Sequence, residues 1–495
     1  QMASEIRVDK INSLSGVGTV TLSPTGVDIS GITTVQTLKV GTGLTASEDG
    51  DVFFTGVCTA TTFNGSGANL TNLPAANVTG TLPAISGANL TSLTAGNLTG
   101  ALPAISGANL TGIAATDNVR TGILDVAGIA TFRSDVNIPN INGGQIGGRR
   151  NLIINGAMTV SQRGTSFDST HGIYLLDRFM LEKENNAANF TTTQSTTSPD
   201  GFSKSLKIDC TLADTSTASN EFVTLRYKIE AQDLQHLSFG TSEAKPLVLS
   251  FYVRSNVTGT YAVNCLQRDN SSKLYTRNYT IDSADTWERK TISIPADTSG
   301  VINDDNGSGL EIYIPLVMGS TYTSGSQSTT AWETYANSKF AAGHAVNVLS
   351  NTSNEWYLTG VQLEVGSTAT AFEHRSYGDE LSLCQRYYFL LAQDDGAQQQ
   401  PIFNAQAYNS STCYGNVYFP CTMRTDPTID ATTGTNYYIT YGNNTSTYST
   451  ALVLEKIGQT NTELETTGGS FSQGNAYFTR TATGAGGKIA FTAEL

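Results

Sequence analysis

The sequence predicts a mainly β protein that consists of a repetitive shaft, an antiparallel β-sandwich and a small β-rich terminal domain with one short helix. Three observations support this fold class. The hexapeptide SGANLT occurs at positions 66, 86 and 106, so part of the chain repeats every 20 residues. Charged residues make up only 14% of the 495 residues, against about 25% in ordinary domains, and Gly, Ser, Thr and Asn replace them. After residue 149, many short apolar stretches alternate with polar turns.

Residues 20–148 are predicted to form the shaft, preceded by an attachment segment at 1–19 and ended by the glycine-rich stretch NGGQIGG at 142–148. No charged residue occurs from Val52 to Thr116, and large side chains are few. Such a repeat must bury its apolar face against the next repeat or against identical chains. A disordered linker is the alternative, but Leu70, Leu90 and Leu110 keep a regular spacing that disorder does not require.

Residues 149–375 have a globular composition with many short strands, which is typical of an antiparallel β-sandwich. The stretches predicted as strands are SLKIDCTL (205–212), LVLSFYVRSN (247–256), TYAVNCLQRD (260–269), RKTISIPA (289–296), LEIYIPLVMG (310–319) and EWYLTGVQLEVG (355–366). Trp287 and Trp356 are expected to lie in the core. The loop at Asp304, Asp305 and Asn306 offers hard oxygen ligands for a structural calcium ion, or is simply an acidic turn.

Residues 376–495 are predicted to form a small β-rich domain. A short helix is expected from Asp379, because Leu381, Cys384, Tyr388 and Leu391 recur at helical spacing. Strands follow to Leu495.

The six cysteines contain no CxxC pair, so we expect buried, reduced thiols and a cytosolic folding compartment rather than a zinc site. The net charge of -14 argues against nucleic acid as a partner. No apolar run approaches the roughly 18 residues of a membrane span, so no membrane insertion is expected.

The sequence lacks the common catalytic motifs. It contains no HExxH, no GxSxG and no nucleotide-binding glycine pattern, so we expect no acyl or phosphoryl transfer. A polysaccharide depolymerase remains the enzymatic alternative, since it needs only two well-placed carboxylates, whose separation no sequence can report. No cofactor is required by this interpretation.

Several motifs resemble the tail fibre and virion structural proteins of tailed bacteriophages, including those of marine cyanobacterial phages. They are NLIINGAMTVSQRGTSF (151–167), YLLDRF (174–179), YKIEAQDL (227–234), LSFYVRS (249–255), WYLTGVQLEVGSTATAFEHRSYGDELSLCQRYY (356–388) and YFPCTMRTDPT (418–428). These motifs are spread, in a specific order, over most of the chain after residue 150. Where this family usually has Asp-Arg-Trp, the chain has Asp177, Arg178 and Phe179, and the phenylalanine is expected to fill core.

The resemblance implies a homotrimeric fibre of the virion, made in the host cytoplasm. It implies an N-terminus held by a tail or baseplate protein, a three-stranded shaft, a jelly-roll sandwich like carbohydrate-binding modules and a distal tip. Three chains around one axis would also supply the apolar partners that the uncharged shaft lacks. A head decoration fibre of the same build is the alternative within the virion.

The predicted function is adhesion to host lipopolysaccharide or another surface glycan through the tip. Sugars stack on aromatic rings while short polar side chains bond their hydroxyl groups. Tyrosines are concentrated after residue 376, although they also suit half-buried strands. The candidate binding residues are Tyr414, Tyr437, Tyr438, Tyr441, Tyr448, Asn443 and Asn444.

Overall fold

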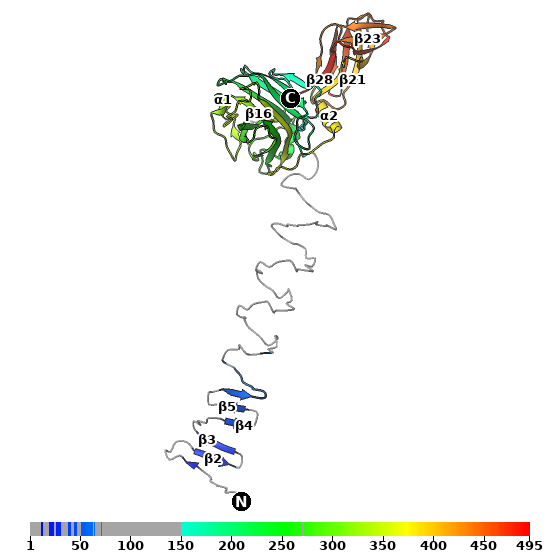
Figure 1. Ribbon diagram of the computed structural model, residues 1–495. Helices are drawn as coiled ribbons and strands as arrows, with labels where there is room; N and C mark the ends of the chain where they lie inside the picture. Colours follow the sequence, from blue (N-terminus) through cyan, green and yellow to red (C-terminus); the bar gives the residue numbers. More distant parts are fainter. Residues whose placement is uncertain are drawn as a thin grey trace. The chain divides into compact units, whose positions relative to one another are not determined.

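The structure is a computed structural model that describes residues 150–269 and 272–495, residues 51–62, 64 and 71, and five short strands before residue 51 (Figure 1). The chain divides into two compact units, residues 1–125 and 126–495, and each is described by itself. The predicted boundary at 142–149 lies outside the described residues.

The described part of the first unit consists of two three-stranded antiparallel sheets. The first sheet contains β1 (Ile11–Asn12), β2 (Thr19–Ser23) and β3 (Gly26–Ser30), and the second contains β4 (Leu38–Val40), β5 (Leu44–Ala46) and β6 (Val52–Phe54). Apart from Thr71, the SGANLT repeats lie outside the described residues, so the repeat architecture stays a prediction.

The second unit begins with an antiparallel β-sandwich of two six-stranded sheets. The first sheet has the order β15-β12-β18-β10-β9-β7, and the second has the order β17-β14-β13-β16-β11-β8. The strands are β7 (Ser166–Asp168), β8 (Phe179–Glu184), β9 (Asn189–Ser195), β10 (Ser205–Leu212), β11 (Phe222–Glu230), β12 (Leu247–Ser255), β13 (Gly259–Gln267), β14 (Lys273–Ile281), β15 (Glu288–Ile294), β16 (Ser308–Met318), β17 (Glu333–Thr334) and β18 (Glu355–Val365). Short helical turns connect them: η5 (Ala231–Leu237), α1 (Ser320–Thr323) and η6 (Asn337–Lys339). All six predicted strands are present, with ends that agree within two residues.

The core of the sandwich follows from strand alternation. On β12, Leu247, Leu249, Phe251 and Val253 point into the core cluster between the sheets. On the neighbouring strand β18, the residues that point into the core have even numbers before Gly360 and odd numbers after it. Gly360 explains the change, because its left-handed φ of +62° creates a bulge at the point where the register with β12 shifts.

The C-terminal domain contains the second core. It begins with α2 (Tyr377–Gln385), which Ser376 caps by accepting a hydrogen bond from the Asp379 amide at 3.2 Å. A three-stranded sheet, β19-β28-β22, and a seven-stranded sheet, β24-β23-β27-β20-β21-β26-β25, share one hydrophobic cluster. The strands are β19 (Tyr388–Gln393), β20 (Pro401–Ala407), β21 (Thr412–Tyr418), β22 (Thr428–Ala431), β23 (Tyr438–Gly442), β24 (Thr445–Ser449), β25 (Ala451–Ile457), β26 (Asn461–Thr467), β27 (Ala476–Thr481) and β28 (Lys488–Thr492).

The predicted fold class is confirmed: the protein is mainly β, with an antiparallel sandwich and a β-rich C-terminal domain that contains one short helix. The helix is shorter than its spacing predicts, because Tyr388 and Leu391 lie in β19. Pairing of β19 with β28 satisfies the backbone of this segment and overrides the helical pattern.

Core predictions for single residues have mixed outcomes. Phe179 and Trp356 are buried in the sandwich core, as expected. Trp287 is only half-buried and packs its ring edge-on against Tyr357. All six cysteines are free thiols, but Cys58 is exposed.

Polar side chains join the sandwich to the C-terminal domain. Glu230 at the end of β11 is fully buried and accepts two hydrogen bonds from Arg386, at 2.7 and 2.8 Å, and one from the Tyr387 hydroxyl. Although burial opposes it, these bonds lower the pKa of the Glu230 carboxyl. Arg178 pairs with Glu494 from the last residues of the chain. Of these residues, Arg178, Glu230, Arg386 and Tyr387 belong to the motifs quoted in the sequence analysis.

Candidate functional site

One side of the seven-stranded sheet covers the core of the C-terminal domain, and the other side is open to solvent. On β21, the side chains of Cys413 and Val417 point into the core, while Asn416 and Tyr418, on either side of Val417, are exposed. The same alternation holds on β20, β26 and β27. We call the solvent-facing side of these strands and of β23, β24 and β25 the outer face.

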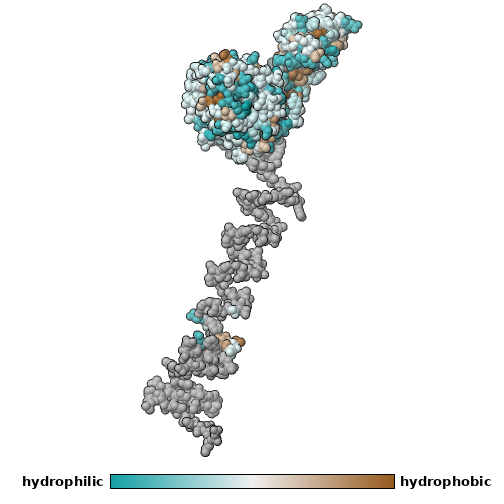
Figure 2. Space-filling model, viewed as in Figure 1, coloured by the Kyte–Doolittle hydropathy of each residue, from teal (hydrophilic) through white to brown (hydrophobic). Residues whose placement is uncertain are grey.

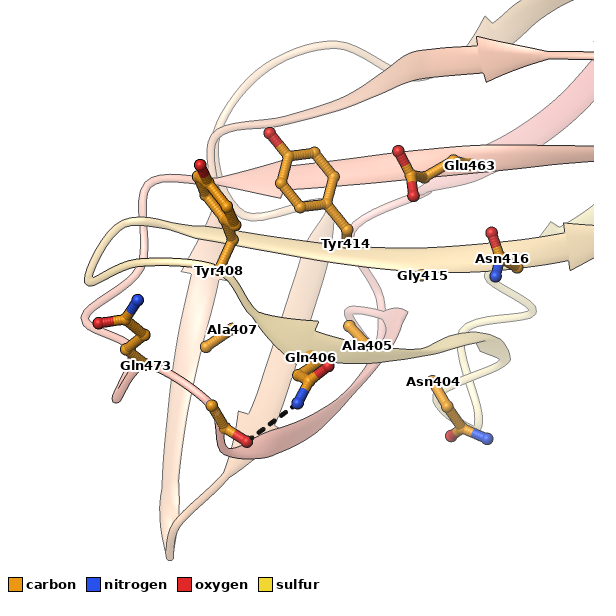
Figure 3. Close-up of a pocket in the computed structure, with 11 residues that line it drawn as sticks. Asn404, Ala405, Gln406, Ala407, Tyr408, Tyr414, Gly415, Asn416, Glu463 and Gln473 are labelled. Carbon is orange, nitrogen blue, oxygen red and sulfur yellow. Dashed lines mark hydrogen bonds between the residues drawn. The ribbon is translucent and has the colours of Figure 1, made fainter.

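A group of tyrosines and amides lines a hollow at one end of the outer face (Figure 3). Tyr408 and Tyr414 lie side by side with their ring centroids 5.7 Å apart, and Tyr408 is 65% exposed. The hollow has a volume of about 580 Å³. Its polar lining includes Asn404, Gln406, Asn416, Glu463 and Gln473. A shallow site of this size with paired rings suits a sugar ring better than an enclosed small molecule.

A second group of rings occupies the neighbouring strands of the outer face. Tyr441 on β23 stacks on Phe478 of β27, with ring centroids 5.6 Å apart and planes 18° apart. Arg480 lies over Phe478, with its guanidinium carbon 4.4 Å from the ring centroid. Tyr448 on β24 is half exposed and pairs with Ile439 of β23 on the same side.

The hairpin between β23 and β24 forms the edge of this second group. Asn443 and Asn444 are the two turn residues, and both have left-handed φ angles, 51° and 58°. Asparagine tolerates this conformation, which the two-residue hairpin requires. With Tyr441 and Phe478 the turn lines a hollow of about 420 Å³.

Several polar side chains of the outer face have no hydrogen-bond partner among the described residues. These are the amides of Asn404, Asn416 and Gln473, the carboxylate of Glu463 and the guanidinium of Arg480. Elsewhere in the unit, polar side chains at the surface of a sheet are commonly paired, as Lys207 is with Glu355 at 2.6 Å. The outer face thus presents unused donors and acceptors beside aromatic rings.

The outer face carries charge of opposite sign at its two ends. Three carboxylates lie around Tyr414: Glu463 and Glu465 on β26, and Glu455 on β25. Lys456 on β25 is a cation in the same region. Desolvation and these carboxylates, Glu465 first, raise the pKa of Tyr414. Burial and the neighbouring Glu455 raise the pKa of Glu465. The Tyr414 end is therefore acidic, whereas the Phe478 end carries Arg480.

The structure separates the predicted sugar-binding residues into a set on the outer face and a set that packs against the core. Tyr414, Tyr441, Tyr448 and the turn at Asn443 and Asn444 belong to the outer face or its edge.

Tyr438 corrects the prediction. It is fully buried, and its hydroxyl donates to the Lys488 carbonyl at 2.5 Å, so it cannot stack on a ligand. Burial raises its pKa to about 12. Tyr437 is half-buried and packs against the same core.

Sequence reasoning missed Phe478, Arg480 and Glu463. The alternation in AYFTRT (476–481) places Phe478 and Arg480 on the same side of one strand, and this signal was available in the sequence.

The predicted calcium loop lies away from these rings in the chain, at an exposed turn of the sandwich. Asp305 accepts a hydrogen bond from the Gly307 amide at 2.8 Å, and Asn306 exchanges hydrogen bonds with the backbone and side chain of Arg424. Within the described residues, no group of three or more His, Cys, Asp or Glu side chains is placed to hold a metal ion. Calcium at Asp304, Asp305 and Asn306 stays a prediction. Among the helices of the described ranges, none combines the length and the hydropathy needed to cross a membrane.

Neither a family model nor a curated protein sequence matches this chain. Solved structures do match it. The enzymatically active domain of tailspike protein 4 of Bacteriophage CBA120 aligns with 10% identity over 43% of this chain and 21% of its own, with a TM-score of 0.25. The chain therefore spans about a fifth of that tailspike chain.

Two carbohydrate-binding modules also match. The family 11 module from Clostridium thermocellum, solved with a β-1,3-1,4-mixed-linked tetrasaccharide, has 12% identity, covers 42% of this chain and 97% of its own, and has a TM-score of 0.20. The TmCBM61 structure with β-1,4-galactotriose has 7% identity, covers 44% and 99%, and has a TM-score of 0.22. At these values the function has to be argued from the residues of this chain.

Proposed function

We propose that this protein is a phage tail fibre, a structural and adhesive virion protein that binds host surface glycans during adsorption without catalytic turnover. The family resemblance of the sequence motifs supports the virion role. The outer face of the C-terminal domain supports the adhesive role, because its exposed rings stand beside polar side chains that lack protein partners.

The chemistry of the outer face suits a carbohydrate. A pyranose ring has an apolar face, which stacks on tyrosine or phenylalanine, and a rim of hydroxyl groups, which exchange hydrogen bonds with amides and carboxylates. Tyr408 and Tyr414 supply such rings, and Asn416 and Glu463 supply such polar groups. In the view of Figure 2, hydrophobic areas on the residues after 149 are small and scattered among hydrophilic ones. A surface of this kind favours a polar ligand over a lipid.

The fibre architecture compensates for weak single sites. A stacked ring contributes only about 0.5–1.5 kcal/mol beyond its buried area. Three copies in a homotrimer, and several fibres on one particle, raise the overall avidity by a factor of about 10²–10⁴. We propose that the N-terminus attaches to a tail or baseplate protein, and that the buried polar junction holds each tip firmly on its sandwich.

The test uses the full-length protein and surface glycans extracted from host cells. Replacing both Tyr408 and Tyr414 by alanine should weaken single-site affinity about 5-fold to 150-fold, which corresponds to about 1–3 kcal/mol. Tyr377→Ala is the matched control, because this tyrosine is 61% exposed but lies on α2. Glycan binding is measured by biolayer interferometry, and light scattering reports the oligomeric state.

The other outcomes are informative as well. Unchanged binding in Tyr408→Ala/Tyr414→Ala and in Tyr441→Ala/Phe478→Ala would show that the outer face is not the adhesive surface. Dissociation of the oligomer in these variants would show that the outer face is instead a contact between subunits.

A further inference from the structure

Arg480 differs from most arginines of this unit, because its guanidinium has no hydrogen-bond or ion-pair partner among the described residues. Arg163, Arg178, Arg226, Arg254, Arg268, Arg375 and Arg386 all form ion pairs with carboxylates. Arg480 forms neither an ion pair nor a side-chain hydrogen bond within the described residues, and its contacts are with rings. Its planar group lies 4.4 Å from the Phe478 centroid and 5.8 Å from that of Tyr441.

This stacking prepares the guanidinium for a ligand. The guanidinium carbon lies within cation–π distance of both rings, which restricts the positions that the planar group can take. A fixed guanidinium loses little entropy when it binds, and its paired donors match the two oxygens of a carboxylate or phosphate. Arg480 also borders a hollow of about 340 Å³ that contains the unpaired amide of Asn404. The hollow thus combines a cation, a neutral polar group and the Phe478 ring.

The charge distribution of the outer face would orient a bound oligosaccharide that carries an anionic group. Glu463 and Glu465 repel anions from the Tyr414 end, whereas Arg480 attracts them at the other. Strands β27 and β21 are both neighbours of β20, so they lie about 10 Å apart across the sheet. Arg480 pairs with Pro401 of β20 and Tyr414 pairs with Gln406, so the two side chains are also offset by about 15 Å along the strands. A short oligosaccharide spans this distance.

We infer that Arg480 is an anion subsite, and that the glycan bound by the outer face carries a carboxylate or phosphate substituent. The acidic group pairs with Arg480, while a neutral sugar residue stacks on Tyr414 at the acidic end. This inference rests on the proposed glycan-binding function and specifies its ligand class.

The experiment compares three forms of the host surface glycan fraction: native, carboxyl-reduced and dephosphorylated. Wild-type protein should bind the native form and lose about 10-fold to 100-fold in affinity for one of the two neutralised forms, which identifies the anion. Arg480→Gln should bind the native form as weakly as wild type binds the neutralised one, and should no longer distinguish them. Arg277→Gln is the matched control, since Arg277 is a half-buried arginine of the sandwich without a described ion pair.

The outcomes separate this inference from the proposed function. Equal binding of all three forms by wild type, or undiminished binding by Arg480→Gln, overturns the anion subsite. If Tyr408→Ala/Tyr414→Ala still loses binding in that case, the glycan proposal stands. No binding of the native fraction by wild type overturns both. A changed oligomeric state of Arg480→Gln in light scattering would assign Arg480 to a subunit contact and also overturn the subsite.

Discussion

Replacing Arg178 by methionine is expected to destabilise the junction between the sandwich and the C-terminal domain. The side chain is 1% exposed, donates to the Lys228 carbonyl at 2.7 Å and pairs with Glu494. Its guanidinium carbon also lies 3.4 Å from the ring centroid of Tyr387. Methionine fills a similar volume without the charge. Because both side chains are unbranched at Cβ, the substitution leaves the strain of the left-handed backbone at this position, φ 75°, much as it is.

The expected loss is about 3 kcal/mol. Removing one partner of a buried ion pair typically costs about 3–5 kcal/mol, because the other charge stays buried. Glu494 keeps a second partner, since its other oxygen lies 2.9 Å from Arg163, so the lower end of this range applies. Arg254→Met is the control. The partner of Arg254 is Asp285, whose side chain is 57% exposed, and breaking such a pair costs about 0–1 kcal/mol.

Urea denaturation of the full-length variants measures the change in unfolding free energy. Glu494→Gln should lose a comparable amount, and the double variant should lose less than the sum of the two, because no unpaired charge then stays buried. A loss in Arg178→Met no larger than in Arg254→Met would refute the reasoning.

Two further predictions concern the sandwich. Burial lowers the pKa of His344 to about 4, so as the pH falls from about 6.5 to 4 the unfolded chain gains a proton that the folded chain does not, and stability should fall by up to about 3 kcal/mol. His344→Asn, which can still accept the hydrogen bond from the Ala262 amide, should remove this part of the pH dependence; identical slopes in thermal melts would contradict it. Gly360→Ala should cost about 2–3 kcal/mol, because it strains a left-handed residue and brings a Cβ to 2.8 Å from Phe202 and Tyr252. Gly172→Ala has φ 77° and open space around it, so its thermal melt should show only the backbone cost, about 1 kcal/mol; equal losses would exclude the steric contribution.

The secondary structure of the sandwich could be predicted closely from the amino-acid sequence, because the pattern that specifies a strand is local. Alternating apolar residues mark β12 within one residue of its end, and the helix expected from Asp379 begins two residues earlier, at Tyr377. Composition also indicated that tyrosines are concentrated after residue 376, and two tyrosines of this part, Tyr408 and Tyr418, are exposed. The same local reasoning extended α2 too far, since it cannot see that β19 has β28 as a partner.

Which side chains share a surface could not be predicted from local patterns, because it depends on how the sheets pack. Tyr438 and Tyr441 are three residues apart and equally aromatic, yet one is core and the other lies on the outer face, because the sides of a strand are assigned by what the sheet packs against. Arg178 and Glu494 are 316 residues apart in the chain, so no local pattern could pair them. Arg480 is a candidate anion-binding residue for the same reason. Folding brings no carboxylate of the described residues within ion-pair distance of it, and no local pattern shows this.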